Sequence, residues 1–176
     1  MENEEKVNQI ARKFGLILTS SGMNMLQSAF HLEPVQISGE QMNTILRKYF
    51  KIEPISHLDG YYYLIPIYQW RQLIEYDWVD TKKWLTDKRD CDNFANAFAA
   101  NISMYYEINS AGRVYGKLYS GTYKFLDYHY FNVIIDSDKK IWFFEPGNDK
   151  LTEVAYEGGM ILIGGNKYEV IQFIFG

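Results

Sequence analysis

The chain has 176 residues, one cysteine and a net charge of −4. This length suggests a single domain, which can bury roughly 70% of its unfolded surface without a disulfide or a metal to staple it. The lone cysteine excludes an internal disulfide and any zinc site built from several cysteines. An acidic chain without a basic cluster is not expected to bind nucleic acid.

The N-terminus, MENEEKVNQI, is polar and lacks the basic start and apolar core of a secretory signal. No apolar run approaches the roughly 20 residues that a membrane span needs. We therefore expect a cytoplasmic protein (in the host cytoplasm if viral) with no membrane partner. Residues 1–176 are treated as one domain, with a helical N-terminal portion over 1–58 and a core over 59–176.

The first sixty residues are expected to be mostly helical. Amphipathic patterns predict short helices from Glu4 to Phe14 and from Gly22 to Phe30. Ser38 and Gln41 have the spacing of a capping box. The helix that it opens is expected to end by Pro54, and its apolar positions are Met42, Ile45, Leu46, Tyr49 and Phe50.

The middle of the chain alternates between strand and helix patterns. An aromatic run predicts a strand over Tyr61 to Ile65, and a helix should follow Pro66. Asp80-Thr81 is expected to cap a further helical turn that holds Trp84 and Leu85. The clearest helix begins at Cys91, and its small and aromatic stripe is Phe94, Ala95, Phe98, Ala99, Ile102 and Tyr105.

Strand patterns follow Gly112. They lie near Val114–Tyr119, Tyr128–Ile135, Ile141–Glu145, Met160–Ile163 and Tyr168–Phe175. Residues 136–140 and 164–166 have the composition of hairpin turns. Helices followed by an antiparallel meander predict an α+β fold, with the helix that begins at Cys91 packed on the sheet.

Cys91 is a candidate nucleophile. It lies at the start of a helix, where unpaired N–H groups and the peptide dipoles favour a thiolate. The neighbouring carboxylates Asp90 and Asp92 work against that charge. Activation also needs a histidine, and His129 on a strand is preferred to His31 and His57, which lie in loop-like stretches.

The β-hairpin after His129 supplies a third candidate. If the loop is Ser137–Lys139, Ile135 faces Ile141, and His129 and Glu145 become diagonal neighbours on one face, within reach of each other. A loop of two residues would place them on opposite faces. Glu145 could then orient the imidazole, with Asn148 as the alternative.

A site for acyl transfer also needs hydrogen-bond donors for the oxyanion. The backbone N–H of Cys91 is the first donor. Trp84, through its indole N–H, and Gln69, through its amide, are the side-chain candidates. By residue type alone, Trp84 is better explained as a core residue.

Four pieces of sequence carry a resemblance: DWVDTKKW, RDCDNFANAF, HYFNVIIDSDKKIWFFEP and GNDK. They resemble the papain-like cysteine protease domain at the C-terminal end of a mushroom agglutinin and its bacterial and phage relatives. More distantly they resemble transglutaminase-like cysteine hydrolases. The resemblance implies a papain-like fold, with Cys91 as nucleophile, His129 as general base, Glu145 as orienting acid and Trp84 as oxyanion donor.

The same resemblance implies that calcium could activate the protein, although no cofactor is expected to be required. Carboxylates that could serve a hard cation are Asp90, Asp92, Asp136 and Asp138. The agglutinin's N-terminal sugar-binding domain is not expected here, because residues 1–58 are too short and too helical for one.

These observations lead to three hypotheses about function. The first is a cysteine peptidase or related hydrolase that cleaves peptide or isopeptide bonds through a Cys91–His129–Glu145 triad and an acyl-enzyme. The second is a cell-wall amidase or endopeptidase. The third is an inactive binding or structural module of the same fold. The expected partner is a protein or peptide substrate, and a homo-oligomer is left open.

Overall fold

The computed structural model describes residues 30–50, 59–157, 160–163 and 165–175. The helix expected from Glu4 to Phe14, nearly all of the one expected from Gly22 to Phe30, and both Pro54 and His57 lie outside these residues. The described elements, in chain order, are β1 (Val35–Ser38), α3 (Gly39–Tyr49), β2 (Tyr61–Leu64), α4 (Ile67–Glu75), the 3₁₀ turn η1 (Val79–Thr81), α5 (Cys91–Tyr106), β3 (Ala111–Tyr119), β4 (Phe125–Ile135), β5 (Ile141–Glu145), β6 (Lys150–Glu153), β7 (Ala155–Glu157), β8 (Met160–Ile163) and β9 (Asn166–Ile174).

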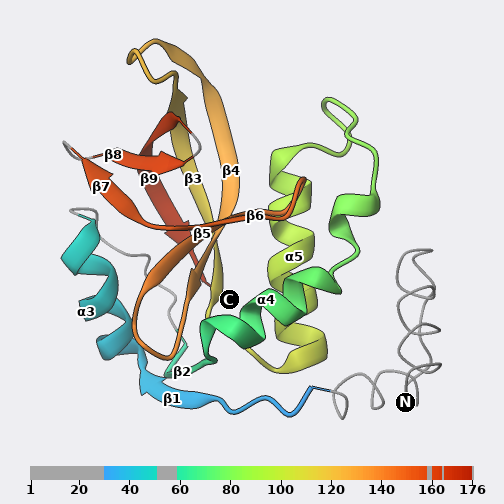
Figure 1. Ribbon diagram of the computed structural model, residues 1–176, viewed down its shortest axis with the longest axis vertical. Coiled ribbons are helices and arrows are strands. Elements are labelled where there is room, and N and C mark those ends of the chain that lie inside the picture. Colours follow the sequence, from blue (N-terminus) through green and yellow to red (C-terminus); the bar gives the residue numbers. More distant parts are fainter. Residues whose placement is uncertain (1–29, 51–58, 158–159, 164, 176) are drawn as a thin grey trace.

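Seven of these strands form one antiparallel sheet, in the order β6-β5-β4-β3-β9-β8-β7. Strands β1 and β2 pair with each other in a separate two-stranded sheet. The central strands β3 and β4 are long and pair along their whole length, whereas β5 pairs only with residues 132–135 of β4. The first half of β4 therefore extends beyond β5 (Figure 1).

The large sheet lies between two layers, each with its own apolar core. On one face, α3, β1 and β2 pack against β4, β5 and β9, with Met42, Leu46 and Phe131 among the buried side chains. On the other face, α4 and α5 pack against β4 and β5, through residues such as Trp70 and Phe98. Alternate residues of β4 thus enter opposite cores, which fixes its register, because a one-residue slip would exchange the two faces.

The helices begin where the sequence supplies their caps. Ser38 and Gln41 form the expected capping box of α3, in which the Gln41 N–H donates to Ser38 Oγ at 3.2 Å. Pro66 precedes α4, as expected, and α5 begins at Cys91. None of the helices among the described residues is long and apolar enough to cross a membrane.

Some local predictions are wrong. Trp84 and Leu85 do not lie in a helical turn, because the helical turn is η1 (Val79–Thr81) and a looped segment closed by a bridge between Leu85 and Arg89 follows it. Asp87 in this loop has a φ of 61°, which no regular helix accommodates. Strands β1, β6 and β7 were not predicted, because they are too short for a strand pattern to stand out in the sequence.

The prediction of an α+β, papain-like fold is also wrong. Strands outnumber helices in the described residues, and one curved antiparallel sheet dominates the architecture (Figure 1). Within residues 30–58, expected to be helical, the described part contributes a strand as well as a helix. The sheet is not a simple meander either, because β3 pairs with β9 rather than ending the sheet.

Candidate binding site

The β4–β5 hairpin brings the first two site residues together. Ile135 faces Ile141, and the Asp136 N–H donates to the Lys140 carbonyl at 3.1 Å, which is the register expected from a three-residue loop. Asp136 is buried and fixes this turn, since its carboxylate accepts the Trp142 indole N–H at 2.8 Å. The tight turn therefore places His129 and Glu145 on the same face of the sheet.

His129 and Glu145 meet directly. Imidazole Nε2 lies 2.6 Å from Glu145 Oε2, and the two side chains are 17% and 21% exposed. Burial lowers the pKa of His129, but the interactions of the imidazole with Cys91 and Glu145 outweigh burial and raise that pKa to about 9. The imidazole therefore carries a positive charge at neutral pH.

Cys91 reaches the same imidazole from α5. Cys91 is one of the groups that raise the pKa of His129, and the residue is half-buried at the first turn of the helix. Asn93 Oδ1 accepts the Asp90 N–H at 3.2 Å and so helps to fix this first turn. A hydrogen bond with Asp90, together with burial, raises the pKa of Asp92.

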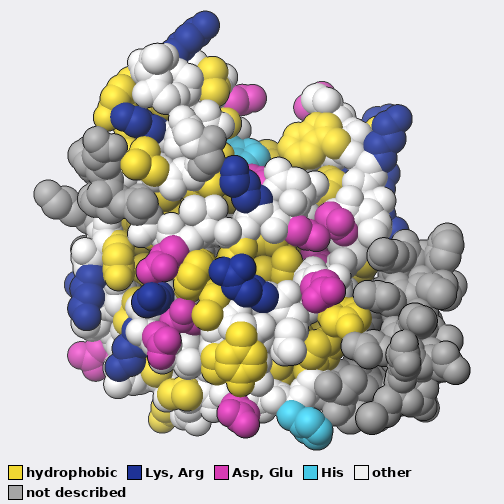
Figure 2. Space-filling view, in the orientation of Figure 1, with side chains coloured by type: hydrophobic (Ala, Val, Ile, Leu, Met, Phe, Trp, Pro, Cys, Tyr) yellow, Lys and Arg dark blue, Asp and Glu magenta, His cyan; other side chains and the backbone are white. Residues whose placement is uncertain are grey.

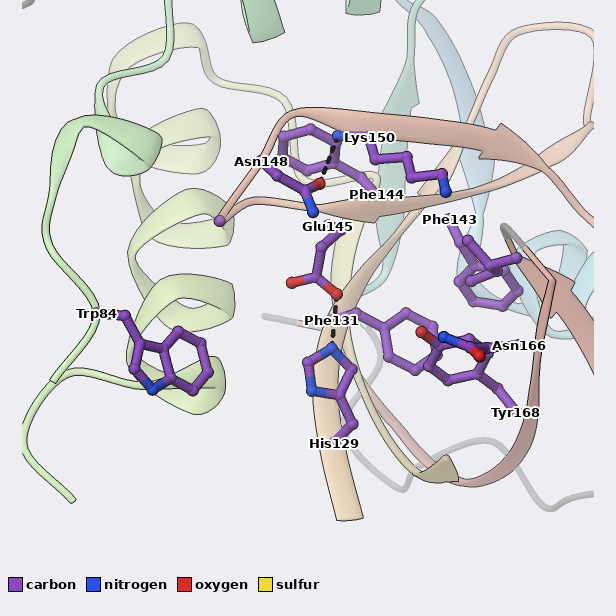
Figure 3. A pocket seen from close by; sticks show the side chains of 12 residues that line it. Trp84, His129, Phe131, Phe143, Phe144, Glu145, Asn148, Lys150, Asn166 and Tyr168 are labelled. Atoms are coloured by element: carbon purple, nitrogen blue, oxygen red, sulfur yellow. Dashed lines mark hydrogen bonds and ion pairs between the residues drawn. The ribbon is translucent and has the colours of Figure 1, made fainter. Parts of the chain in front are cut away.

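His129 and Glu145 line a cleft with a volume of about 360 Å³, whereas Cys91 is not among its lining residues. Figure 2 shows a notch at this end of the molecule, and Figure 3 shows the side chains that line the cleft. The polar atoms come from His129, Glu145, Asn148, Lys150 and Asn166. An apolar floor is formed by Phe131, Phe143, Phe144, Ile163 and Tyr168.

Trp84 stands on the side of the cleft opposite His129 (Figure 3). Its ring is 48% exposed and stacks on Phe94 of α5, with a centroid distance of 5.7 Å. Exposure of this kind is unusual for a residue that only fills a core. Trp84 therefore presents an aromatic surface, with a polar N–H, to whatever occupies the cleft.

The alternative site residues have other partners or positions. Gln69 is buried at α4, where its side chain bonds the His31 carbonyl and the Glu33 N–H. Asn148 lines the cleft, but its Oδ1 accepts the Lys150 N–H at 3.1 Å, and Glu145 rather than Asn148 contacts His129. The roles expected for Cys91, His129, Glu145 and Trp84 remain predictions, although the structure brings His129, Glu145 and Trp84 to one cleft.

No group of three or more metal-ligating side chains occurs in the described part of the chain. Of the carboxylates considered for calcium, Asp90 and Asp92 interact with each other, whereas Asp136 bonds the Trp142 indole and the Lys140 N–H. Activation by calcium stays a prediction. Asp77 and Asp149 form another pair of interacting carboxylates. Burial and the charge of Asp149 raise the pKa of Asp77 to about 7.

Sequence reasoning missed the contribution of the last strands to the cleft. Tyr168 and Asn166 on β9 and Ile163 on β8 form one wall, and the rings of His129 and Tyr168 lie 6.1 Å apart. Burial and the charge of Glu145 raise the pKa of Tyr168 to about 12, so its hydroxyl stays protonated. Knowledge of the pairing between β3 and β9 would have revealed this wall. Residue patterns, however, do not show which strands pair when they are far apart in the sequence.

Comparison with known proteins shows a fold that this chain shares with solved structures, but it does not assign the chain to a family. No family model matches the chain, and no curated protein matches it. Among solved structures, a Polyporus squamosus lectin, described as bound to the human-type influenza-binding epitope Neu5Acα2-6Galβ1-4GlcNAc, has a TM-score of 0.61 at 18% identity over 80% of this chain. A structure described as the PSL1a–E64 complex has a TM-score of 0.60 at 17% identity, also over 80%. The chain spans about half the length of each, 49% and 51% respectively.

This comparison corrects the functional predictions. The first solved structure is named as a lectin and is described in complex with a sugar, whereas no hydrolase family matches. The predictions of papain-like membership, of a cysteine peptidase and of hydrolysis through a catalytic triad are therefore contradicted. A protein or peptide substrate is likewise not supported. The third hypothesis, a binding module, agrees best with the comparison.

Proposed function

We propose that the chain is a binding module that takes a carbohydrate ligand in the cleft between Trp84 and His129. The observation that carries this proposal is the composition of the cleft: an exposed indole faces a cationic imidazole, a carboxylate and two amides above an aromatic floor. Concave sites that combine aromatic surface with a few converging polar groups are typical of small-ligand binding. The sugar in the complex of the lectin with the similar fold supports the class of ligand.

A sugar has two kinds of surface, and the cleft offers a complement to each. The C–H faces of a pyranose ring can pack on the Trp84 indole, which is rigid and already held by Phe94. Hydroxyl groups can donate to Glu145 and can bond Asn148 and Asn166. A ligand that carries a carboxylate would also gain from the positive charge of His129.

The test is calorimetric titration with the trisaccharide Neu5Acα2-6Galβ1-4GlcNAc and with the same trisaccharide without its sialic acid. We expect saturable binding that Trp84→Ala weakens at least about tenfold, equivalent to about 1.4 kcal/mol. The matched control is Tyr68→Ala, which removes another exposed aromatic ring at a distant helix. Absence of binding by both sugars, or equal effects of the two variants, would overturn the proposal.

A second candidate is covalent capture of an electrophilic ligand by Cys91. The contact between thiol and imidazole, and the E64 complex of one structure of similar fold, favour it. The Cys91 sulfur would attack an epoxide carbon, the carbon–oxygen bond would break, and His129 would give its proton to the oxygen. Glu145 would hold the imidazole, and the Trp84 indole N–H could donate to the same oxygen.

Mass spectrometry after incubation with E64 tests this candidate. We expect one adduct per chain, absent in Cys91→Ala and slower in His129→Gln. No adduct under native conditions, or an adduct that forms equally fast in His129→Gln, would contradict it. Either outcome leaves the sugar titration readable, because the two experiments use different probes.

A further inference from the structure

Asn132 joins α5 to the sheet through a single buried side chain. It lies on β4, is completely buried, and donates from Nδ2 to two carbonyl oxygens. One belongs to Ala95, one turn after Cys91 in α5, at 2.9 Å. The other belongs to Gly112 in β3, at 3.1 Å. The amide thus binds a helix and a neighbouring strand at the same time.

A buried amide at position 132 is less favourable for stability than an apolar side chain would be. Its Oδ1 is buried and has no hydrogen-bond partner among the described residues. An unpaired buried oxygen is destabilising, and an apolar side chain of similar size would avoid that cost. The amide makes two directed hydrogen bonds that a leucine could not make. These bonds fix the position of α5 along β4.

The position of α5 along β4 determines where the Cys91 thiol lies. Cys91 is four residues before Ala95 on the helix, and His129 is three residues before Asn132 on the strand. The bond from Asn132 to Ala95 therefore joins the helix that carries Cys91 to the strand that carries His129. Glu145 depends on it less, because β5 pairs directly with β4 and holds Glu145 independently of the helix.

We propose that Asn132 is a positioning residue, whose side-chain amide holds α5 at the height on β4 at which the Cys91 thiol contacts the His129 imidazole. It touches neither group and acts through the helix. The proposal deepens the proposed binding function, because His129 lines the cleft of that function, and its test requires no ligand.

The experiment measures the His129 pKa by NMR titration, together with the rate at which iodoacetamide alkylates Cys91 at pH 7. In Asn132→Leu the helix can shift, so the contact between thiol and imidazole weakens while that with Glu145 remains. We expect the His129 pKa to fall by about one unit, and alkylation to slow at least about tenfold as the cation beside the sulfur is withdrawn. Should Asn132→Leu fail to fold, Asn132→Thr, which is smaller and suits a strand, gives the same readouts.

Gln69→Leu is the matched control. Gln69 is also a buried amide that bonds two backbone groups, but it joins α4 to residues 31–33, away from the cleft. A general loss of stability would appear in both variants, whereas the shift in the His129 pKa should appear only at Asn132. An unchanged His129 pKa in Asn132→Leu, or an equal shift in Gln69→Leu, would overturn the proposal. Failure of the parent protein to bind sugar would leave this result readable and would count only against the binding function.

Discussion

His129 Nε2 and Glu145 Oε2 lie 2.6 Å apart, although sixteen positions separate the two residues in the chain. The contact depends on one turn, because a loop one residue shorter would place the side chains on opposite faces of the sheet. It leaves the imidazole charged at neutral pH and fixes its orientation at the edge of a cleft that also holds Trp84.

Glu145 holds the proton on His129. In Glu145→Gln the carboxylate charge is lost, whereas the size of the side chain is kept. We expect the His129 pKa to fall from about 9 by roughly one to two units, measured by NMR titration of the imidazole. Glu153→Gln, which removes an exposed carboxylate from the neighbouring strand β6, should leave the pKa unchanged. An unaltered titration in Glu145→Gln would show that the contact does not control the charge.

Asp77 makes stability depend on pH. Burial and the charge of Asp149 raise its pKa to about 7, above the value of about 4 in an unfolded chain. A raised pKa in the folded state means that its contribution to stability is complete below about pH 4 and is lost as the pH rises through about 7.

Asp77→Asn should therefore stabilise the protein at pH 8, by on the order of 2 kcal/mol, and have a smaller effect at pH 5. Urea denaturation at the two pH values measures the difference. Asp87→Asn, at an exposed loop position, serves as the control and should change neither value. A destabilisation by Asp77→Asn at pH 8 would show that the folded protein needs the charged carboxylate.

Asp136 determines the hairpin geometry. It is buried and accepts hydrogen bonds from the Lys140 N–H and the Trp142 indole N–H, at 2.9 and 2.8 Å. Asp136→Ala leaves both donors without this partner, which should cost about 2–4 kcal/mol in the free energy of unfolding. Asp138→Ala, in the same turn but exposed, should cost less than about 0.5 kcal/mol. Equal losses in the two variants would show that burial of the carboxylate has no energetic role.

The sequence predicted this hairpin because its signals are strong and local. Ile135 and Ile141 flank a polar loop, and a loop of three residues was one of the two registers that the sequence allowed. The start of α5 was predictable for a similar reason, since a polar stretch ends and an apolar stripe begins at Cys91. In each case the decisive residues are neighbours in the chain.

Other features depend on contacts between distant segments. Lys150–Glu153 forms a strand only because β5 provides a partner edge, and its polar sequence carries no strand pattern. The wall of the cleft at Tyr168 depends on the pairing of β3 with β9. Function was least predictable, because a cysteine, a histidine and a glutamate suit a hydrolase by residue type, whereas a solved structure of similar fold is named as a lectin.

The central claim is that a sugar occupies the cleft between Trp84 and His129. The most direct measurement is an NMR titration with Neu5Acα2-6Galβ1-4GlcNAc that follows the Trp84 indole N–H and the His129 imidazole. We predict saturable shifts of both signals with one common affinity, and unmoved signals from the distant indole of Trp70, which is fully buried. Unmoved signals from Trp84 and His129 at saturating sugar, or turnover of a peptide substrate that depends on Cys91, would contradict the account.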